Sequence, residues 1–258
     1  MMQEPGAQLI AYKGIAVLLW LAALFAAERL WPAAPYPDAA PPKWRRLLGN
    51  GVLWGVNAGL SVLLVVPVTA WAAGAAPQWR PLWWSGWSGL VLDLFILDGL
   101  IYGWHRVNHV VPFFWRFHSV HHLDRTLDST SALRFHFGEV VLSALARAGV
   151  VLALAVPLVS VLVFETVLLI ATIFHHSNLR LPPALERALS RIIVTPSIHW
   201  VHHHRIRADT DSNYSTVLSI WDPLFRSRSP TPRTPDLEIG VEHRDELPVL
   251  GLLAAPFQ

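Results

Sequence analysis

Long apolar runs dominate the first two thirds of the chain. They cover residues 9–27, 51–76, 82–104 and 139–175, and each reaches the roughly 20 residues that a helix needs to cross a bilayer. The first run ends in charged residues, Trp31 and Pro32, as an interfacial belt and a helix stop would. A cleaved signal peptide is the alternative for this run, but no basic stretch precedes it.

The last apolar run is long for one helix and holds Pro157 near its middle. Because proline interrupts helical hydrogen bonding, we predict a helical hairpin that turns there and returns both ends to one side of the membrane. One long tilted span is the alternative, and it would carry the end of the run to the opposite side.

Basic residues set the expected orientation. Three cations, Lys43, Arg45 and Arg46, lie in the loop 37–50, whereas the connection 77–81 holds only Arg80. The positive-inside rule therefore places the first loop in the cytoplasm and the start of the chain outside. From residue 178 onward the chain is polar with no spanning segment, and residues 227–235 form a linker rich in Pro and Arg.

Composition supports this membrane interpretation. Hydrophobic residues make up 53% of the chain and charged residues only 15%, which disfavours a purely soluble protein. A formal net charge of +2 offers no basic field for nucleic acid. The absence of cysteine excludes disulfides, thiolate metal sites and a cysteine nucleophile.

Thirteen histidines are the chemical signal that stands out. His105 and His109 lie four apart, which on a helix stacks both imidazoles on one face. An H-x-x-H-H spacing then occurs twice, and an adjacent pair ends the predicted hairpin. These residues are His118, His121 and His122, then His199, His202 and His203, and between them His175 and His176.

Metal binding is the chemistry that suits so many imidazoles, since neutral histidine is a good ligand for iron, copper, zinc or nickel. Eight or more exceed what one ion can hold, so the pattern implies two ions. A single one of these residues is better explained as a core or interfacial histidine, whereas the ensemble is not. Their place at the ends of spans also differs from a metal conduit, whose ligands lie at mid-membrane.

Three segments resemble the fatty acid hydroxylase and sterol desaturase superfamily in sequence, order and spacing: DGLIYGWHRVNHVVPFFWRFHSVHH, FHHSNLRLP, and TPSIHWVHHH followed by NYSTVLSIWDPLF. The resemblance is strongest over residues 90–226. It implies an all-α integral membrane bundle of about four to five spanning or hairpin helices with a cytoplasmic, histidine-rich metal cap. We expect residues 1–258 to form a single domain of this type, with residues 227–258 as a Pro- and Arg-rich tail.

The resemblance also implies function: a non-haem di-iron enzyme that hydroxylates or desaturates lipids with O2 and electrons from a separate ferredoxin- or cytochrome-type donor. Zinc is an alternative occupant in purified protein. The substrate would be a fatty acyl chain, sterol, carotenoid or related terpenoid, and the location a bacterial inner membrane with the metal site on the cytoplasmic side. The expected metal ligands are His105, His109, His118, His121, His122, His175, His176, His199, His202 and His203.

Two positions in the ligand set stay open. Some relatives have a histidine four residues before the adjacent pair, where this chain has Ala171 and Thr172, so the sequence does not decide which of His175 and His176 binds. His204 lies one position beyond the pattern and is expected to be a neighbour.

Carboxylates near the histidines could orient them. Asp98 lies seven residues before His105, on the same helical face, where it could orient a ligand imidazole; helix packing is the alternative role. The segment RFHFGE resembles a family R-x-H-P-x-E element, with Phe137 in place of proline, and we expect Arg134, His136 and Glu139 to support the site.

A membrane zinc hydrolase and a non-enzymatic metal-binding membrane protein are the alternative functions. The chain has neither a G-x-S-x-G elbow nor an H-E-x-x-H helix, which weakens hydrolysis by known routes.

Overall fold

The computed structural model describes residues 4–38 and 40–258, with the side chains of residues 4–11 left outside. Within these residues the chain forms helices and isolated β-bridges but no strand, which confirms the all-α prediction. The long helices are α1 (Glu4–Leu30), α2 (Lys43–Leu60) with its continuation α3 (Val66–Ala75), α4 (Gly86–Val110), α6 (Phe137–Leu154) and α7 (Leu158–His176). The short ones are α5 (Pro112–His122), α8 (Pro183–Leu189), α9 (Pro196–His202), α10 (Arg207–Thr210), α11 (Trp221–Leu224) and α12 (Val249–Ala254).

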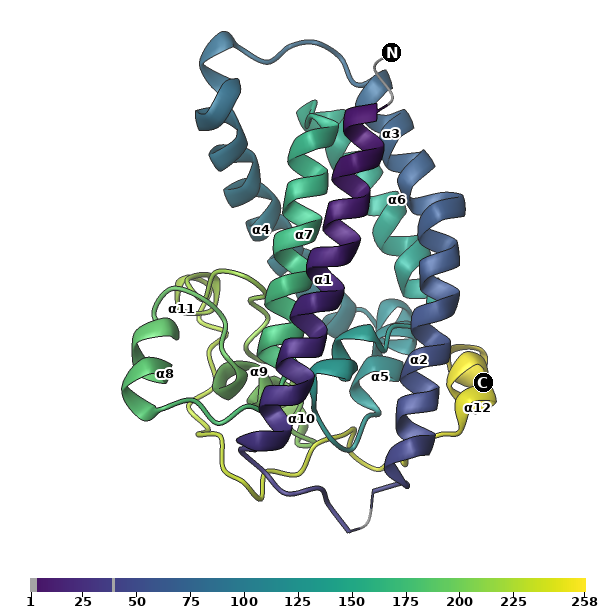
Figure 1. Cartoon of the computed structure of the whole chain (residues 1–258), viewed down its shortest axis with the longest axis vertical. Coiled ribbons are helices and arrows are strands. Elements are labelled where there is room, and N and C mark those ends of the chain that lie inside the picture. Colours follow the sequence, from purple (N-terminus) through teal and green to yellow (C-terminus); the bar gives the residue numbers. More distant parts are fainter. Residues whose placement is uncertain (1–3, 39) are drawn as a thin grey trace.

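The long helices stand side by side and the short ones gather at one end (Figure 1). We call residues 111–136 and 177–258, at that end, the cap. Four helical segments of the described chain are long and apolar enough to cross a membrane: Lys43–Ala75, Gly86–Val110, Phe137–Leu154 and Leu158–His176. The predicted first span falls on α1, a fifth long helix that packs along α7. Because the structure does not describe the side chains of residues 9–11 in that run, its role as a membrane span stays a prediction.

One wide turn lets α2 and α3 continue as a single span. The π-helical segment Ser61–Val65 joins them and ends two positions before Pro67. In a regular helix the ring of Pro67 would collide with the carbonyl of Leu63, four positions earlier. A π turn relieves such a collision by widening the backbone locally, so the proline interrupts neither the span nor its apolar surface.

The helical hairpin between α6 and α7 is confirmed. Ala155 takes a left-handed conformation with φ of 50°, and Pro157 begins the return. Across the hairpin, Arg147 and Glu165 form an ion pair at 3.0 Å. The turn lies at the end of the bundle opposite the cap (Figure 1), so both outer ends of the hairpin reach the cap. The alternative of one long tilted span is therefore wrong.

Apolar packing holds the bundle together around α3, α4, α6 and α7. Val151 of α6 and Val161 of α7 are fully buried in one cluster with Ala72 and Leu97. Small and branched side chains at these positions allow the four helices to pack closely. This core lies toward the hairpin end of the bundle and holds together α4 and α7, whose opposite ends carry histidines.

The tail beyond residue 227 is more closely packed than the sequence suggests. Ser229 and Thr231 of the predicted linker both donate hydrogen bonds to Asp209. Further along, Leu252 of α12 is buried against Leu53 of α2. The tail thus forms part of the cap.

Topology can be tested with reporters of membrane sidedness. We expect a reporter inserted after Ser129 or Ser212 to be cytoplasmic and one at Pro77 to be external, because Ser129 and Ser212 belong to the cap and Pro77 lies at the far end of α3. Accessibility to a membrane-impermeant label would measure this. If the reporters after Ser129 and Ser212 were labelled from opposite sides of the membrane, the arrangement would be contradicted.

Candidate metal centre

Nine of the ten predicted histidines gather in two adjacent groups. In each group one nitrogen from every ring lies within 4.8 Å of the others, and all nine residues are buried. The first group comes from α4, α5 and α9, and the second from α5, α7 and α9 together with the residue that follows α9. The first comprises His105, His109, His118, His122 and His202, and the second His121, His176, His199 and His203.

Helical spacing explains how the repeated motif serves both groups. On α5, His118 and His122 lie four residues apart on one face and enter the first group, whereas His121 points to the second. The second copy of the motif is divided the other way, since His199 and His203 enter the second group and His202 the first. Each copy of H-x-x-H-H therefore spans both groups and ties them together.

Hydrogen bonds fix the orientation of several rings. The Nδ1 atoms of His105 and His202 donate to the backbone carbonyls of Tyr214 and Ser212, at 2.8 Å and 2.6 Å. A neutral imidazole carries a single N–H. Because each proton is used at Nδ1, the Nε2 lone pairs are left facing the interior of the group.

The second group holds its rings in the same way. His121 donates from Nδ1 to the carbonyl of Arg134 at 3.1 Å, and His176 donates to that of Thr172 at 2.7 Å. Their Nε2 atoms nevertheless lie only 3.0 Å apart. Two facing lone pairs at this distance repel each other unless a cation lies between them, so the arrangement fits a metal ion.

Distances between other nitrogens support the same fit. The Nε2 pairs His176–His199, His199–His203 and His118–His122 lie 3.0, 3.1 and 3.2 Å apart. With metal–nitrogen bonds of about 2.1 Å, two ligands at right angles on one ion lie about 3.0 Å apart. The two groups therefore have the donor atoms, spacing and burial that a pair of metal ions requires.

Burial also keeps the rings neutral. Removal from water lowers the pKa of five histidines of the cap well below the usual value, and the neighbouring imidazoles lower it further. A neutral ring keeps the lone pair that binds a metal. These residues are His121, His122, His199, His202 and His203.

The structure separates the three histidines whose roles the sequence leaves open or excludes. His176 enters the second group, while His175 lies outside both, donates from Nδ1 to Thr216 at 3.1 Å and packs on His199. His204 faces Asp209 at 2.7 Å, away from both groups. The hydroxyl of Thr172, where some relatives have a histidine, donates to the carbonyl of Leu168, so the second group has one histidine fewer than the first.

Glu139 forms a hydrogen bond with a histidine of the first group, whereas Asp211 lies 3.4 Å from His109. Oε1 of Glu139 accepts from Nδ1 of His118 at 2.8 Å, and Asn108 approaches the same oxygen at 3.5 Å. A carboxylate behind a ligand imidazole fixes its tautomer and raises its basicity. From the sequence, we expect Glu139 to support the site as part of the RFHFGE segment, but the pattern does not identify His118 as its partner.

Asp98 makes the contacts of a helix-packing residue, which is the alternative to orienting a ligand. Its Oδ2 accepts from Nε1 of Trp221 at 2.7 Å and from the backbone N–H of Leu218 at 3.1 Å. No hydrogen bond joins Asp98 to a histidine anywhere in the described chain. Although Asp98 and His105 share a helical face, seven residues separate them by two turns, about 10.5 Å along the axis. Asp98 therefore fastens α11 to α4.

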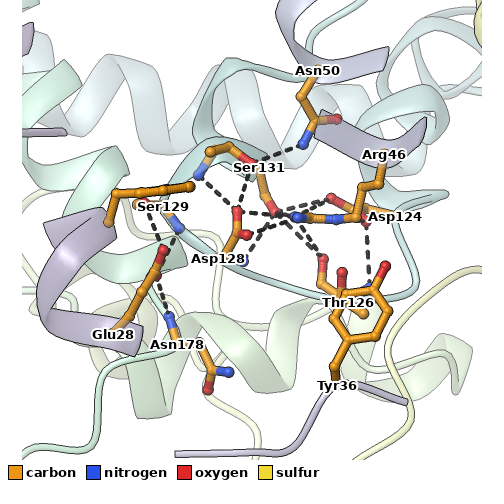
Figure 2. Close-up of polar contacts among 12 residues, drawn as sticks. Glu28, Tyr36, Arg46, Asn50, Asp124, Thr126, Asp128, Ser129, Ser131 and Asn178 are labelled. Atoms are coloured by element: carbon orange, nitrogen blue, oxygen red, sulfur yellow. Dashed lines mark hydrogen bonds and ion pairs between the residues drawn. The ribbon is translucent and has the colours of Figure 1, made fainter. Parts of the chain in front are cut away.

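A buried network of charges supports the histidine motif of α5 (Figure 2). Arg46 of α2 donates to Asp124 at 2.7 Å and 2.9 Å, and to Asp128 at 2.7 Å. Burial would raise the pKa of Asp124, but the guanidinium of Arg46 holds it below its usual value. The sequence pattern indicates an interfacial cation at Arg46; the structure places this residue inside the protein, so that Lys43 and Arg45 are the exposed cations of that loop.

Two further carboxylates extend the network toward both ends of the chain. Glu28 of α1 accepts from the backbone N–H groups of Ser129 and Asn178, each at 2.9 Å (Figure 2). Glu246 of the tail accepts from Arg134 at 2.9 Å. Since the Arg134 carbonyl holds His121, the network connects α1, α2 and the tail to the second group.

Replacing Glu139 tests the carboxylate. We expect Glu139→Gln to weaken metal binding by about 10- to 100-fold, the usual contribution of a carboxylate behind a ligand histidine. Metal content after dialysis against a graded chelator would measure it. Asp98→Asn is the matched control, because the amide oxygen can still accept from Trp221, and it should retain metal as the parent does. Greater metal loss from Asp98→Asn than from Glu139→Gln would show that Asp98, and not Glu139, supports the metal-binding histidines.

Comparison with known proteins adds to this geometry. The fatty acid hydroxylase family matches residues 90–227, which include every histidine of both groups. The chain is 30% identical over 168 residues to the ornithine lipid hydroxylase OlsE of Rhizobium tropici, covering 65% of this chain and 50% of that protein. It is 29% identical over 198 residues to the alkylglycerol monooxygenase of Caenorhabditis elegans, covering 76% of this chain and 35% of that protein.

The chain thus spans half or less of the length of these two relatives. No solved structure matches the chain significantly. The family match covers more than half of the residues and coincides with the segments whose motifs point to the same group. The chain therefore belongs to the fatty acid hydroxylase family.

Proposed function

We propose that the protein is a membrane enzyme that hydroxylates or desaturates a lipid with O2 at a histidine-bound pair of iron ions. The observation that carries this proposal is the presence of two adjacent, buried groups of five and four histidines whose free nitrogens face inward. When bound, iron would supply activation of O2 for attack on an unactivated C–H bond. Similar proteins named as a lipid hydroxylase and an alkylglycerol monooxygenase support the same reaction class.

The chain's own residues would hold and orient the ions. The first group would bind one ion and the second group the other, with water completing the second set in place of a fifth histidine. Backbone carbonyls of Tyr214, Ser212 and Arg134 keep Nδ1 protonated on their partners, so that Nε2 is the binding atom. Burial of all nine rings excludes bulk water, which protects the reacting centre from side reactions.

The substrate would be a bulky apolar lipid: a fatty acyl chain, sterol, carotenoid or related terpenoid. Both groups lie where α4 and α7 leave the candidate spans, so an apolar chain in the bilayer needs to move only a short way to reach them. We propose a bacterial inner membrane with the cap on the cytoplasmic side, and a single functional domain over residues 1–258.

A separate ferredoxin- or cytochrome-type protein would supply the electrons. Trp115 is half-buried and lies against His109 and His122, with ring centroids 5.0 Å and 5.4 Å away. The partly exposed guanidinium of Arg207 covers the same indole at 4.4 Å. This stack links the first group to the protein surface and is the most direct place for such a donor to approach.

Isotope labelling tests the reaction. Cells that express the protein should form an oxidised lipid only in the presence of O2, and the oxygen of a hydroxylated product should come from labelled O2. A zinc hydrolase would take its oxygen from water, because its nucleophile is a metal-bound water. Mass spectrometry of extracted lipids would measure the label. Label from water with no need for O2 would reject the proposal in favour of the hydrolase.

A further inference from the structure

A hollow of about 520 Å³ lies on the side of the cap, away from the histidines. It is formed by α8, the turn that follows it, and the segment around α11. Figure 1 shows α8 and α11 together at one side of the cap. Three arginines line it together with small and apolar side chains, namely Arg187, Arg191, Arg228, Ser219, Ile220 and Pro223.

The arginines of this hollow have no acidic partners. None of the three forms an ion pair with a carboxylate in the part of the chain that the structure describes. The nearest acid in sequence, Glu186, instead accepts a hydrogen bond from Ser197. Three uncompensated guanidinium groups around one concavity attract an anion, and their planar donor pairs suit phosphate oxygens in particular.

The position of α11 places the hollow beside the bilayer. Trp221 packs on Phe95 of α4, with ring centroids 5.0 Å apart, and bonds to Asp98. Both partners belong to the candidate span Gly86–Val110. The hollow therefore opens next to a helix that is long and apolar enough to cross the membrane.

Apolar side chains on the same elements support this placement. Ile192 is 62% exposed, Leu224 64% and Phe225 51%. Exposed apolar groups interleaved with arginine are typical of the headgroup boundary, where the apolar parts enter the acyl region and the cations meet phosphate. A soluble phosphate compound or an acidic protein would not require this apolar rim.

We propose that the hollow binds the phosphate of an anionic glycerophospholipid of the bilayer, with Arg187, Arg191 and Arg228 around the headgroup and the acyl chains along Leu224 and Phe225. The segment that forms one wall also reaches the histidines, since Tyr214 accepts from His105 and Thr216 from His175. A bound lipid would thus hold this segment against α4. The proposal does not depend on the bound metal or on the reaction.

Native mass spectrometry of the full chain in detergent tests the site, with phosphatidylglycerol and phosphatidylcholine of identical acyl chains as probes. We expect preferential retention of phosphatidylglycerol, weakened on the order of tenfold in Arg187→Gln/Arg191→Gln. The matched control is Arg106→Gln/Arg116→Gln, which removes two exposed, unpaired arginines of the described chain that lie outside the hollow, and it should bind as the parent does. Arg228→Gln, a single change on another segment, should also weaken retention.

Three results would overturn the proposal. Equal retention of the two lipids by the parent protein would remove the requirement for an anionic headgroup. Equal weakening in the two double variants would indicate general attraction to the basic surface rather than a site. Displacement of the lipid by millimolar inorganic phosphate, with phosphate retained in its place, would assign the hollow to a free anion.

Discussion

His202→Ala is expected to abolish lipid oxidation and to lower the metal content of the purified protein. His202 is one of five imidazoles in the first group, and its Nδ1 bond to Ser212 directs Nε2 inward. Alanine would leave an ion in the first group with one ligand fewer, among residues that are all buried. Residues behind the ligands already contribute about 10- to 100-fold to metal affinity, so loss of a ligand should exceed that range. Metal analysis and product formation would be measured together.

Two other histidines provide the controls. His204 faces Asp209, and His243 is exposed with a positive φ, so neither belongs to a group. His204→Ala and His243→Ala should keep both metal and activity, whereas His121→Ala should behave as His202→Ala does. Equal loss in all four variants would show that the two groups are wrongly assigned.

Arg46→Met should lower the free energy of unfolding by about 3–5 kcal/mol, the usual cost of leaving buried charges without their partner. Asp124 is fully buried and Arg46 nearly so. Methionine fills a similar volume but supplies none of the bonds to Asp124 and Asp128. Denaturant unfolding in detergent micelles, followed by tryptophan fluorescence, would measure the change.

The neighbouring position gives a matched control. Arg45 is exposed on the same helix, and Arg45→Met should alter stability by less than about 0.5 kcal/mol. Equally small losses of stability in the two variants would contradict the structure. They would mean that water can replace the contacts of Arg46 in Figure 2, as it does at an exposed site, although Arg46 is buried.

The apolar pattern was sufficient to predict four helical segments long and apolar enough to span and the turn at Pro157, because bilayer thickness and the chemistry of proline act locally. The clustering of the histidines was also predictable, since a spacing of four places two imidazoles on one helix face, as for His118 and His122. Partners brought together from distant segments were not. The burial of Arg46 depends on Asp124, 78 positions later, and the choice of His176 over His175 depends on where α5 and α9 meet α7. Asp98 shows the opposite limit, because sharing a helical face does not bring two side chains within reach.

The charge network has a consequence for the order in which the protein matures. The histidines are contributed by residues 105–203, yet the groups that brace them include Glu28 and Arg46, made early, and Glu246, made late. A nascent chain that has just released His203 from the ribosome already carries every histidine of both groups but lacks the carboxylate that holds Arg134. Stable metal loading should therefore follow the synthesis of Glu246, after all the histidines of both groups have already been made.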